Sequence, residues 1–255
     1  YWAKAAGFLI EKHKPNLLLY HLLNLDATHH RYGPKTPAGY TGIAYADDRI
    51  KELLDSLRKV GVLDRTTLLI VSDHGFKNVR HQIRANVLLR EQGLVRREGG
   101  KLTCDAWVVP EGGSALVYVT DPSKKRELAP RLRQLFSGVK GVSRVLGPKE
   151  FPALGLPLPE KSDQAPDLVL AAAEGYTFAG GEEGSAAQDI AEGGSHGYLN
   201  SDPDMQEVFV AWGYGIRKGA RLDLFDNIDV APTVARLLGV SMSGIDGQVL
   251  SRALQ

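Results

Sequence analysis

The stretch Val71-Ser72-Asp73-His74-Gly75 follows an apolar run rich in β-branched residues. That run predicts a buried strand over residues 66–72, so the stretch lies at a strand exit. An adjacent Asp and His there, with a glycine that allows a tight turn, offer oxygen and nitrogen ligands to a metal ion. The alternative is an Asp that caps the following turn beside a surface His, and the stretch alone favours neither.

The composition is that of an ordinary globular protein. The chain has 255 residues, of which 43% are hydrophobic and 24% charged, and its formal net charge is +1. No global field therefore attracts nucleic acid or a membrane, and we expect no sequence-specific nucleic-acid partner. The single cysteine, Cys104, excludes a disulfide framework and a Cys-rich zinc finger. No run of 18 apolar residues occurs, so no transmembrane segment is predicted.

The first 72 residues predict an alternation of helices and strands. Helical patterns cover residues 2–14 and 37–60, and the continuous apolar run 16–23 suits a strand buried on both faces, as in a parallel sheet. Residues 26–37 are polar and predict a loop. Asp and His residues follow each predicted strand, and open α/β sheets bind ligands beyond the carboxyl ends of their strands.

The middle of the chain has a different texture. Residues 81–180 predict an α+β insertion, a cap subdomain, within a core formed by residues 1–80 and 181–255. Its expected elements are helices at 85–91 and after Asp121-Pro122, a hairpin within 93–113, and strands at 114–120, 142–146 and 167–172. Residues 174–204 are Gly-rich and predict little regular structure. A strand at 205–212 and a helix capped by Asp229 complete the chain.

Five candidate metal ligands fall in the predicted strand-exit loops: Asp26, His30, Asp73, His74 and His196. Each is weak alone, because Asp and His are common in loops and the glycines around His196 also suit a mobile loop. Together they are more specific. The other histidines lack this setting: His13 and His81 are expected at the surface, His21 packed within a strand, and His29 beside a ligand.

Three motifs in order carry a family resemblance: LDATHHRYGP at 25–34, VSDHG at 71–75 and GGSHGYLN at 193–200. The chain resembles the nucleotide pyrophosphatase/phosphodiesterase branch of the alkaline phosphatase superfamily. The resemblance implies an α/β fold, with an alkaline-phosphatase-like sheet flanked by helices and an α+β cap insertion. It does not extend to residues 81–180, which resemble the variable insertions of the superfamily.

The resemblance also implies two divalent metal ions, zinc in the family. One would be held by Asp26, His30 and His196, the other by Asp73, His74 and a further Asp. A Thr or Ser nucleophile would form a covalent intermediate with the phosphorus of a small phosphate ester, and water at the first metal would release it. Two cations about 3.5–4 Å apart can clamp the attacking and leaving oxygens of such a displacement.

The further Asp and the nucleophile lie upstream of the first motif in the family. The resemblance therefore covers about the C-terminal two thirds of the catalytic domain, and we expect the N-terminal strand or strands to be missing. No residue of this chain is assigned as the nucleophile. With three ligands at the first site and two at the second, we expect weak metal binding at the second, little turnover, and an unpaired strand edge.

Two alternatives stay open. A phosphomonoesterase, phosphonate hydrolase, sulfatase-like enzyme or phosphate mutase would keep the superfamily and change the substrate, although the Tyr of GSHGY and the D-x-x-x-H-x-x-G-P pattern favour the phosphodiesterase branch. A non-catalytic fragment or pseudoenzyme would keep the fold without the chemistry. Many bacterial members of the family are exported, but the sequence favours neither a periplasmic or secreted location nor a cytoplasmic one.

Overall fold

A computed structural model describes residues 1–255 and divides into two compact units. Unit 1 comprises residues 1–25, 41–73 and 207–255, and unit 2 comprises residues 26–40 and 74–206. This grouping differs from the predicted boundaries, because the segments that carry Asp26 and His196 group with the middle of the chain. The assignment of residues 81–180 to an inserted cap subdomain stays a prediction.

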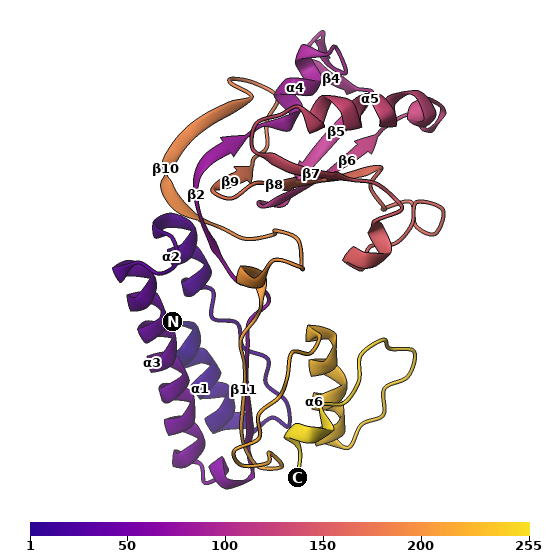
Figure 1. Ribbon diagram of the computed structural model, residues 1–255. Helices are drawn as coiled ribbons and strands as arrows, with labels where there is room; N and C mark the ends of the chain where they lie inside the picture. Colours follow the sequence, from indigo (N-terminus) through magenta and orange to yellow (C-terminus); the bar gives the residue numbers. More distant parts are fainter. The chain divides into compact units, whose positions relative to one another are not determined.

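Unit 1 is built from helices and one strand pair. Its elements are α1 (Trp2–His13), α3 (Pro37–Lys59, whose first turn belongs to unit 2), β1 (Thr67–Val71), β11 (Phe209–Gly213) and α6 (Val230–Leu238). All five were predicted within a few residues of these bounds. In Figure 1, α1 and α3 lie side by side. Ala6 and Ile10, one helical turn apart, bury their side chains with Leu53 between the two helices.

The predicted strand at residues 16–23 is wrong. These residues form no strand, and Leu19 is 83% exposed. His21, expected to pack within that strand, is exposed. β1 pairs with β11 alone, antiparallel rather than parallel, and its side chains are only partly buried. An apolar run becomes a strand only where a neighbouring strand pairs with its N–H and C=O groups. β1 pairs with β11 and forms no such pairing with residues 16–23.

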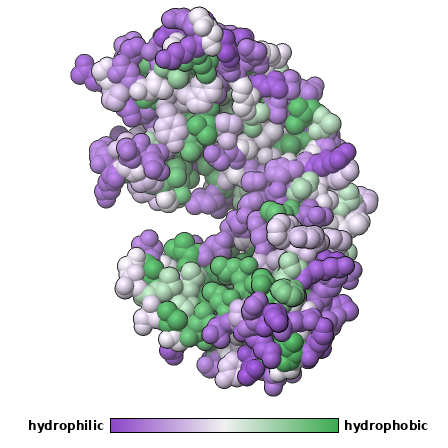
Figure 2. All heavy atoms as spheres, turned by 180° about the vertical axis from the view of Figure 1, so that it is seen from behind, coloured by the Kyte–Doolittle hydropathy of each residue, from purple (hydrophilic) through white to green (hydrophobic).

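Exposed apolar side chains gather on unit 1, and Figure 2 shows hydrophobic surface on the face of that unit that is turned toward the viewer. They include Leu17, Leu19, Val208, Val210 and Trp212, each about half exposed or more. Val71, at the end of β1, is 47% exposed. None of the helices combines the length and the apolar character needed to cross a bilayer.

Unit 2 contains three sheets and three α-helices. Its helices are α2 (Asn24–Tyr32, almost all of it in this unit), α4 (Ala85–Glu91) and α5 (Lys125–Ser137). Its strands are β2 (Lys77–Ile83), β3 (Val95–Glu98), β4 (Lys101–Cys104), β5 (Ala106–Pro110), β6 (Ser114–Val119), β7 (Val142–Leu146), β8 (Leu168–Ala172), β9 (Tyr176–Phe178) and β10 (Ala187–Ser195). They form sheets of order β10-β2-β9 and β5-β6-β8-β7 and the hairpin β3-β4. Only β2 and β9 pair in parallel.

The main core of unit 2 lies between α5 and the four-stranded sheet (Figure 1). Leu128, Leu132 and Phe136 follow one another at four-residue spacing and are at most 4% exposed. They pack with Val117 and Leu170 of β6 and β8. Burying side chains of this size stabilises the fold by about 1.5–3 kcal/mol each.

The predicted loop at residues 174–204 contains two strands, β9 and the nine-residue β10. β10 is polar and carries two glycines, so its sequence gives almost no strand signal. Pairing with β2 overrides this, although the register shifts between Asp189 and Gly193. Ser195, the last residue of β10, pairs with Lys77. The residue that follows Ser195 is His196.

Candidate metal centre

Asp26 and His30 lie on a helix rather than in the predicted loop. Both belong to α2, four residues apart, and the Asp26 Oδ1 and His30 Nε2 atoms are 3.5 Å apart. α2 has an acidic residue in its first turn and His29, His30 and Arg31 in its last turn. The Asp26 carboxylate in the first turn and the Arg31 guanidinium in the last turn suit the helix dipole. That charge pattern, with the i, i+4 spacing, is the signal from which the helix could have been predicted.

His74 and His196 meet the same carboxylate oxygen. Asp26 Oδ1 lies 3.7 Å from His74 Nε2 and 3.8 Å from His196 Nε2. The imidazole rings of His74 and His196 stack with 3.7 Å between their centroids and 11° between their planes. Three imidazoles from α2, from the segment before β2 and from the end of β10 therefore converge on one oxygen atom.

The tautomers of His30 and His74 follow from the hydrogen bonds that their Nδ1 atoms make. His30 Nδ1 lies 3.1 Å from the Gly194 carbonyl oxygen, and His74 Nδ1 lies 3.0 Å from that of Gly75. A carbonyl oxygen can only accept, so Nδ1 carries the proton and donates it. In the neutral imidazole, Nε2 then carries a lone pair. Metal-binding histidines commonly have this arrangement, with the second ring nitrogen donating to a backbone carbonyl.

The Asp26 Oδ1 atom is buried and has no hydrogen-bond donor. The three Nε2 atoms are beyond hydrogen-bond distance, and at least two of them face it with lone pairs. One ligand atom each from Asp26, His30 and His196 lies within 4.8 Å of the others. A carboxylate and imidazoles form the donor set of Zn²⁺, and three protein ligands with one open position are typical of catalytic zinc. The residues therefore fit a divalent cation.

Comparison with known proteins now bears on this centre. Residues 2–199 match the family described as Type I phosphodiesterase / nucleotide pyrophosphatase. The chain belongs to this family. It is 25% identical over 219 residues to bis(5'-adenosyl)-triphosphatase enpp4 of Mus musculus, covering 84% of the chain and 42% of that relative. It is 25% identical over 233 residues to human ectonucleotide pyrophosphatase/phosphodiesterase family member 7, covering 88% of the chain and 45% of that relative.

The fold is also that of solved family structures. An inactive variant of murine ectonucleotide pyrophosphatase/phosphodiesterase 5, in complex with AMP, matches 99% of the chain and 63% of its own chain. Its TM-score is 0.75 at 18% sequence identity. This confirms the predicted fold class. The chain spans less than half the length of the two curated relatives named above.

The segment GGSHG, residues 193–197, is in close contact with neighbouring backbone beside the centre. A Cβ atom on Gly194 would lie 2.3 Å from the His29 carbonyl oxygen of α2, so no larger residue fits there. Gly197 has a φ of +73°, and its Cβ would lie 1.8 Å from the Glu111 carbonyl oxygen. Gly113 N–H donates to the His196 carbonyl oxygen at 2.7 Å. The backbone on both sides of His196 is therefore fixed by its neighbours.

Phe76 was not predicted as a site residue. Its ring centroid lies 5.0–5.3 Å from those of four histidines, with the ring planes steeply inclined. These are His29, His30, His74 and His196. Edge-to-face packing on one ring limits how far the imidazoles can rotate. His29 Nε2 is buried without a partner, and burial lowers the pKa of His29. The only sequence signal was that Phe76 follows the VSDHG motif.

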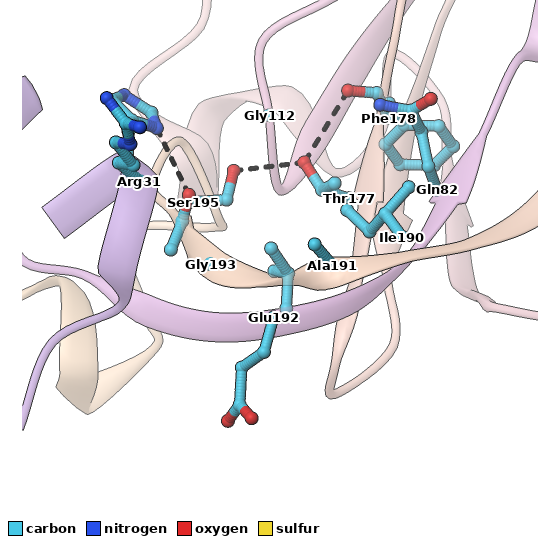
Figure 3. A pocket seen from close by; sticks show the side chains of 13 residues that line it. Arg31, Gln82, Gly112, Thr177, Phe178, Ile190, Ala191, Glu192, Gly193 and Ser195 are labelled. Atoms are coloured by element: carbon cyan, nitrogen blue, oxygen red, sulfur yellow. Dashed lines mark hydrogen bonds between the residues drawn. The ribbon is translucent and has the colours of Figure 1, made fainter. Parts of the chain in front are cut away.

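The structure thus gathers four of the five predicted ligands. The fifth, Asp73, is an exposed residue at the end of a segment of unit 1, directly before His74 of unit 2. Beside the cluster lies a cavity of about 350 Å³, lined by His30, Arg31 and the shifted part of β10. Figure 3 shows the buried hydroxyl groups of Thr177 and Ser195, two of the residues that line this cavity, pointing toward each other, 2.9 Å apart.

Proposed function

We propose that this chain supplies the metal-binding part of a hydrolase that cleaves phosphodiester or pyrophosphate bonds of nucleotide-type substrates. The observation that carries the proposal is the buried Asp26 Oδ1 atom, which has no donor and is faced by three imidazole nitrogens at 3.5–3.8 Å. Asp26 Oδ1 and the Nε2 lone pairs of His30 and His74 are three acceptors, and at this separation they repel one another unless a cation lies among them.

In this proposal Asp26, His30 and His196 hold one divalent metal ion, most simply Zn²⁺. His74 and Asp73 contribute to a second. When bound, such ions would supply Lewis-acid polarisation of the phosphoryl oxygens. The protein's own contribution is to orient the ligands: Gly194 and Gly75 carbonyls hold the imidazole tautomers, and Phe76 limits ring rotation. The attacking Thr or Ser hydroxyl is assigned to no residue of this chain.

The substrate class rests on the relatives. One is named a bis(5'-adenosyl)-triphosphatase, and a structure of another contains AMP. Both names point to nucleoside phosphates. We extend this class to the present chain as a proposal, because the centre shown here holds ligands for metal rather than groups that would select a base.

The test is hydrolysis by the protein expressed from its complete reading frame. Zinc-dependent cleavage of a nitrophenyl nucleotide diester, lost with a chelator and with His196→Ala, is expected. His13→Ala is the matched control, because His13 is an exposed histidine of α1. Cleavage of nitrophenyl phosphate but not of the diester would instead support a phosphomonoesterase. Tight zinc binding without cleavage of any phosphate ester would support the non-catalytic alternative.

A further inference from the structure

Lys77 has a buried, strongly paired side chain that the proposed chemistry does not use. It is the first residue of β2, three residues after His74, and its side chain is 9% exposed. Its Nζ atom lies 2.5 Å from Glu174, 2.9 Å from Asp202 and 3.8 Å from Asp204. It also lies 5.4 Å from the centre of the Tyr198 ring. A buried ammonium is costly unless it is paired, so this arrangement holds its partners in place.

Lys77 joins the two ends of the loop that begins with His196. Its backbone pairs with Ser195 in the β2–β10 ladder, directly before the loop. Its ammonium contacts Asp202 near the other end. The Asp202 side chain also accepts a hydrogen bond from the Asp204 N–H at 3.0 Å, which fixes the turn that carries both carboxylates. Residues 195–204 are thus closed into a ring by one residue, through its backbone at one end and its side chain at the other.

The far end of this loop touches the other ligand-bearing segments. Gly75, directly after His74, donates its N–H to the Met205 carbonyl oxygen at 3.2 Å. A Cβ on Gly75 would lie 1.9 Å from the Asp204 carbonyl oxygen, so the backbones are in direct contact. Asp204 also pairs at 3.7 Å with Lys35, three residues after the end of α2. Closing the loop therefore constrains the backbone positions of both His196 and His74.

We propose that Lys77 is a positioning residue, which closes the loop of residues 195–204 and so holds His196 and His74 in their metal-binding arrangement. The inference rests on the proposed metal-binding function. Burial works against the charged form, but hydrogen bonds to Glu174 and Asp202 outweigh it and raise the pKa of Lys77 above its ordinary value. The closure is therefore intact across the neutral pH range.

The first test needs no metal. Amide hydrogen exchange of peptides covering residues 195–204 is compared in the parent protein, Lys77→Met and Asn86→Ala, all metal-free. Asn86 is the control, since it is buried elsewhere in unit 2 and holds the Val108 backbone through two hydrogen bonds. We expect Lys77→Met to speed exchange selectively in 195–204, and Asn86→Ala to lower overall stability without that selectivity. Unchanged exchange in folded Lys77→Met overturns the inference.

The second test measures zinc affinity by competition with a chromophoric chelator. Loss of a residue that supports metal ligands typically weakens binding by about 10–100-fold, and we expect this for Lys77→Met and for Asp202→Asn. Lys77→Arg keeps the charge and should recover most of the affinity, whereas Asn86→Ala should leave it unchanged. Parent-like affinity in both Lys77→Met and Asp202→Asn would overturn the inference while leaving the proposed function intact. Absence of zinc binding by the parent would overturn the proposed function, and the exchange experiment would still decide whether Lys77 closes the loop.

Discussion

Replacing Asp26 by asparagine separates metal binding from folding. The Asp26 Oδ1 atom has no hydrogen-bond donor, and its nearest polar neighbours are imidazole nitrogens. The side-chain amide of the Asp26→Asn variant would keep the shape, remove the negative charge, and offer an N–H to a nitrogen lone pair. Because a buried unsatisfied acceptor costs about 1–3 kcal/mol, we expect the metal-free variant to be at least as stable as the parent.

Zinc should reveal the cost of the substitution. A ligand at 100 times its dissociation constant stabilises the folded state by about 2.7 kcal/mol. For a chain of this size, that raises the melting temperature by roughly 5–10 °C, since each 1 kcal/mol is worth about 2–4 °C. If Asp26→Asn weakens binding 100-fold, the same zinc concentration equals the dissociation constant and stabilises by only about 0.4 kcal/mol. The shift should then fall to about 1–2 °C.

The assay is thermal unfolding followed by circular dichroism, with zinc and with a chelator, near pH 7.5. Asp47→Asn is the matched control, because Asp47 is an exposed carboxylate of α3 in unit 1. It should keep the full zinc shift. If Asp26→Asn also keeps the full shift, the carboxylate is not a ligand and the interpretation of its buried oxygen is wrong.

Three further predictions follow from the same structure. The 255-residue chain alone should bind one zinc ion tightly, because Asp26, His30 and His196 supply three ligands. It should also cleave diesters slowly or not at all. Two tightly bound ions by elemental analysis, or rapid turnover, would contradict this. Gly197→Ala should lower the free energy of unfolding in urea by more than Gly181→Ala. Both glycines have a positive φ that costs alanine about 1–2 kcal/mol, but only a Cβ on Gly197 would meet another atom. Equal losses of unfolding free energy would refute the close approach to Glu111. Burial alone would raise the pKa of Asp202, but hydrogen bonds from Lys77 and the Asp204 N–H lower it. The stabilising contribution of Asp202 is therefore present above the ordinary aspartate range and is lost as the pH falls below about 4. The drop in unfolding free energy between pH 5 and pH 3 should accordingly be smaller in Asp202→Asn than in Asp47→Asn.

Local pattern predicted the elements whose own side chains determine them. The apolar periodicity of α3 and α5, and the compact apolar runs of β6 and β8, gave those elements to within a few residues. α5, β6 and β8 each bury a regular stripe or run, so their stability comes from what the sequence displays, whereas in α3 the stripe is only partly covered and Leu53 is its one buried apolar side chain. The five predicted ligands were found in the same way, from residue type and spacing, and four of them meet in unit 2.

The failures share a physical cause, which is that pairing partners are not visible locally. Residues 16–23 have strand-type side chains and no strand to pair with, whereas β10 has poor strand residues and pairs with all but one of the seven residues of β2. α2 was missed because its helix is short and polar, with no buried residue to give an apolar period. Lys77 and Phe76 could not be foreseen, since their roles depend on segments distant in the sequence, such as those of Asp202 and His196.

In the proposed metal centre, Asp26 Oδ1 affects both the stability of the metal-free protein and its affinity for metal. Without a cation, Asp26 Oδ1 and the lone pairs of His30 and His74 repel one another, and in our proposal the glycine contacts around His196 and the Lys77 ion pairs hold them there nonetheless. In the proposed function a bound cation would convert that repulsion into attraction, so much of the binding free energy would be relief of strain that the fold has already imposed. Substitutions of the ligands should therefore stabilise the metal-free protein or leave it unchanged, whereas substitutions of the supporting residues should weaken the metal-free protein and its metal affinity together. A preorganised metal centre requires that the stability of the metal-free protein falls in the variants of the supporting residues and does not fall in the ligand variants. A loss of stability in both classes of variant would mean that the cluster is ordinary polar packing.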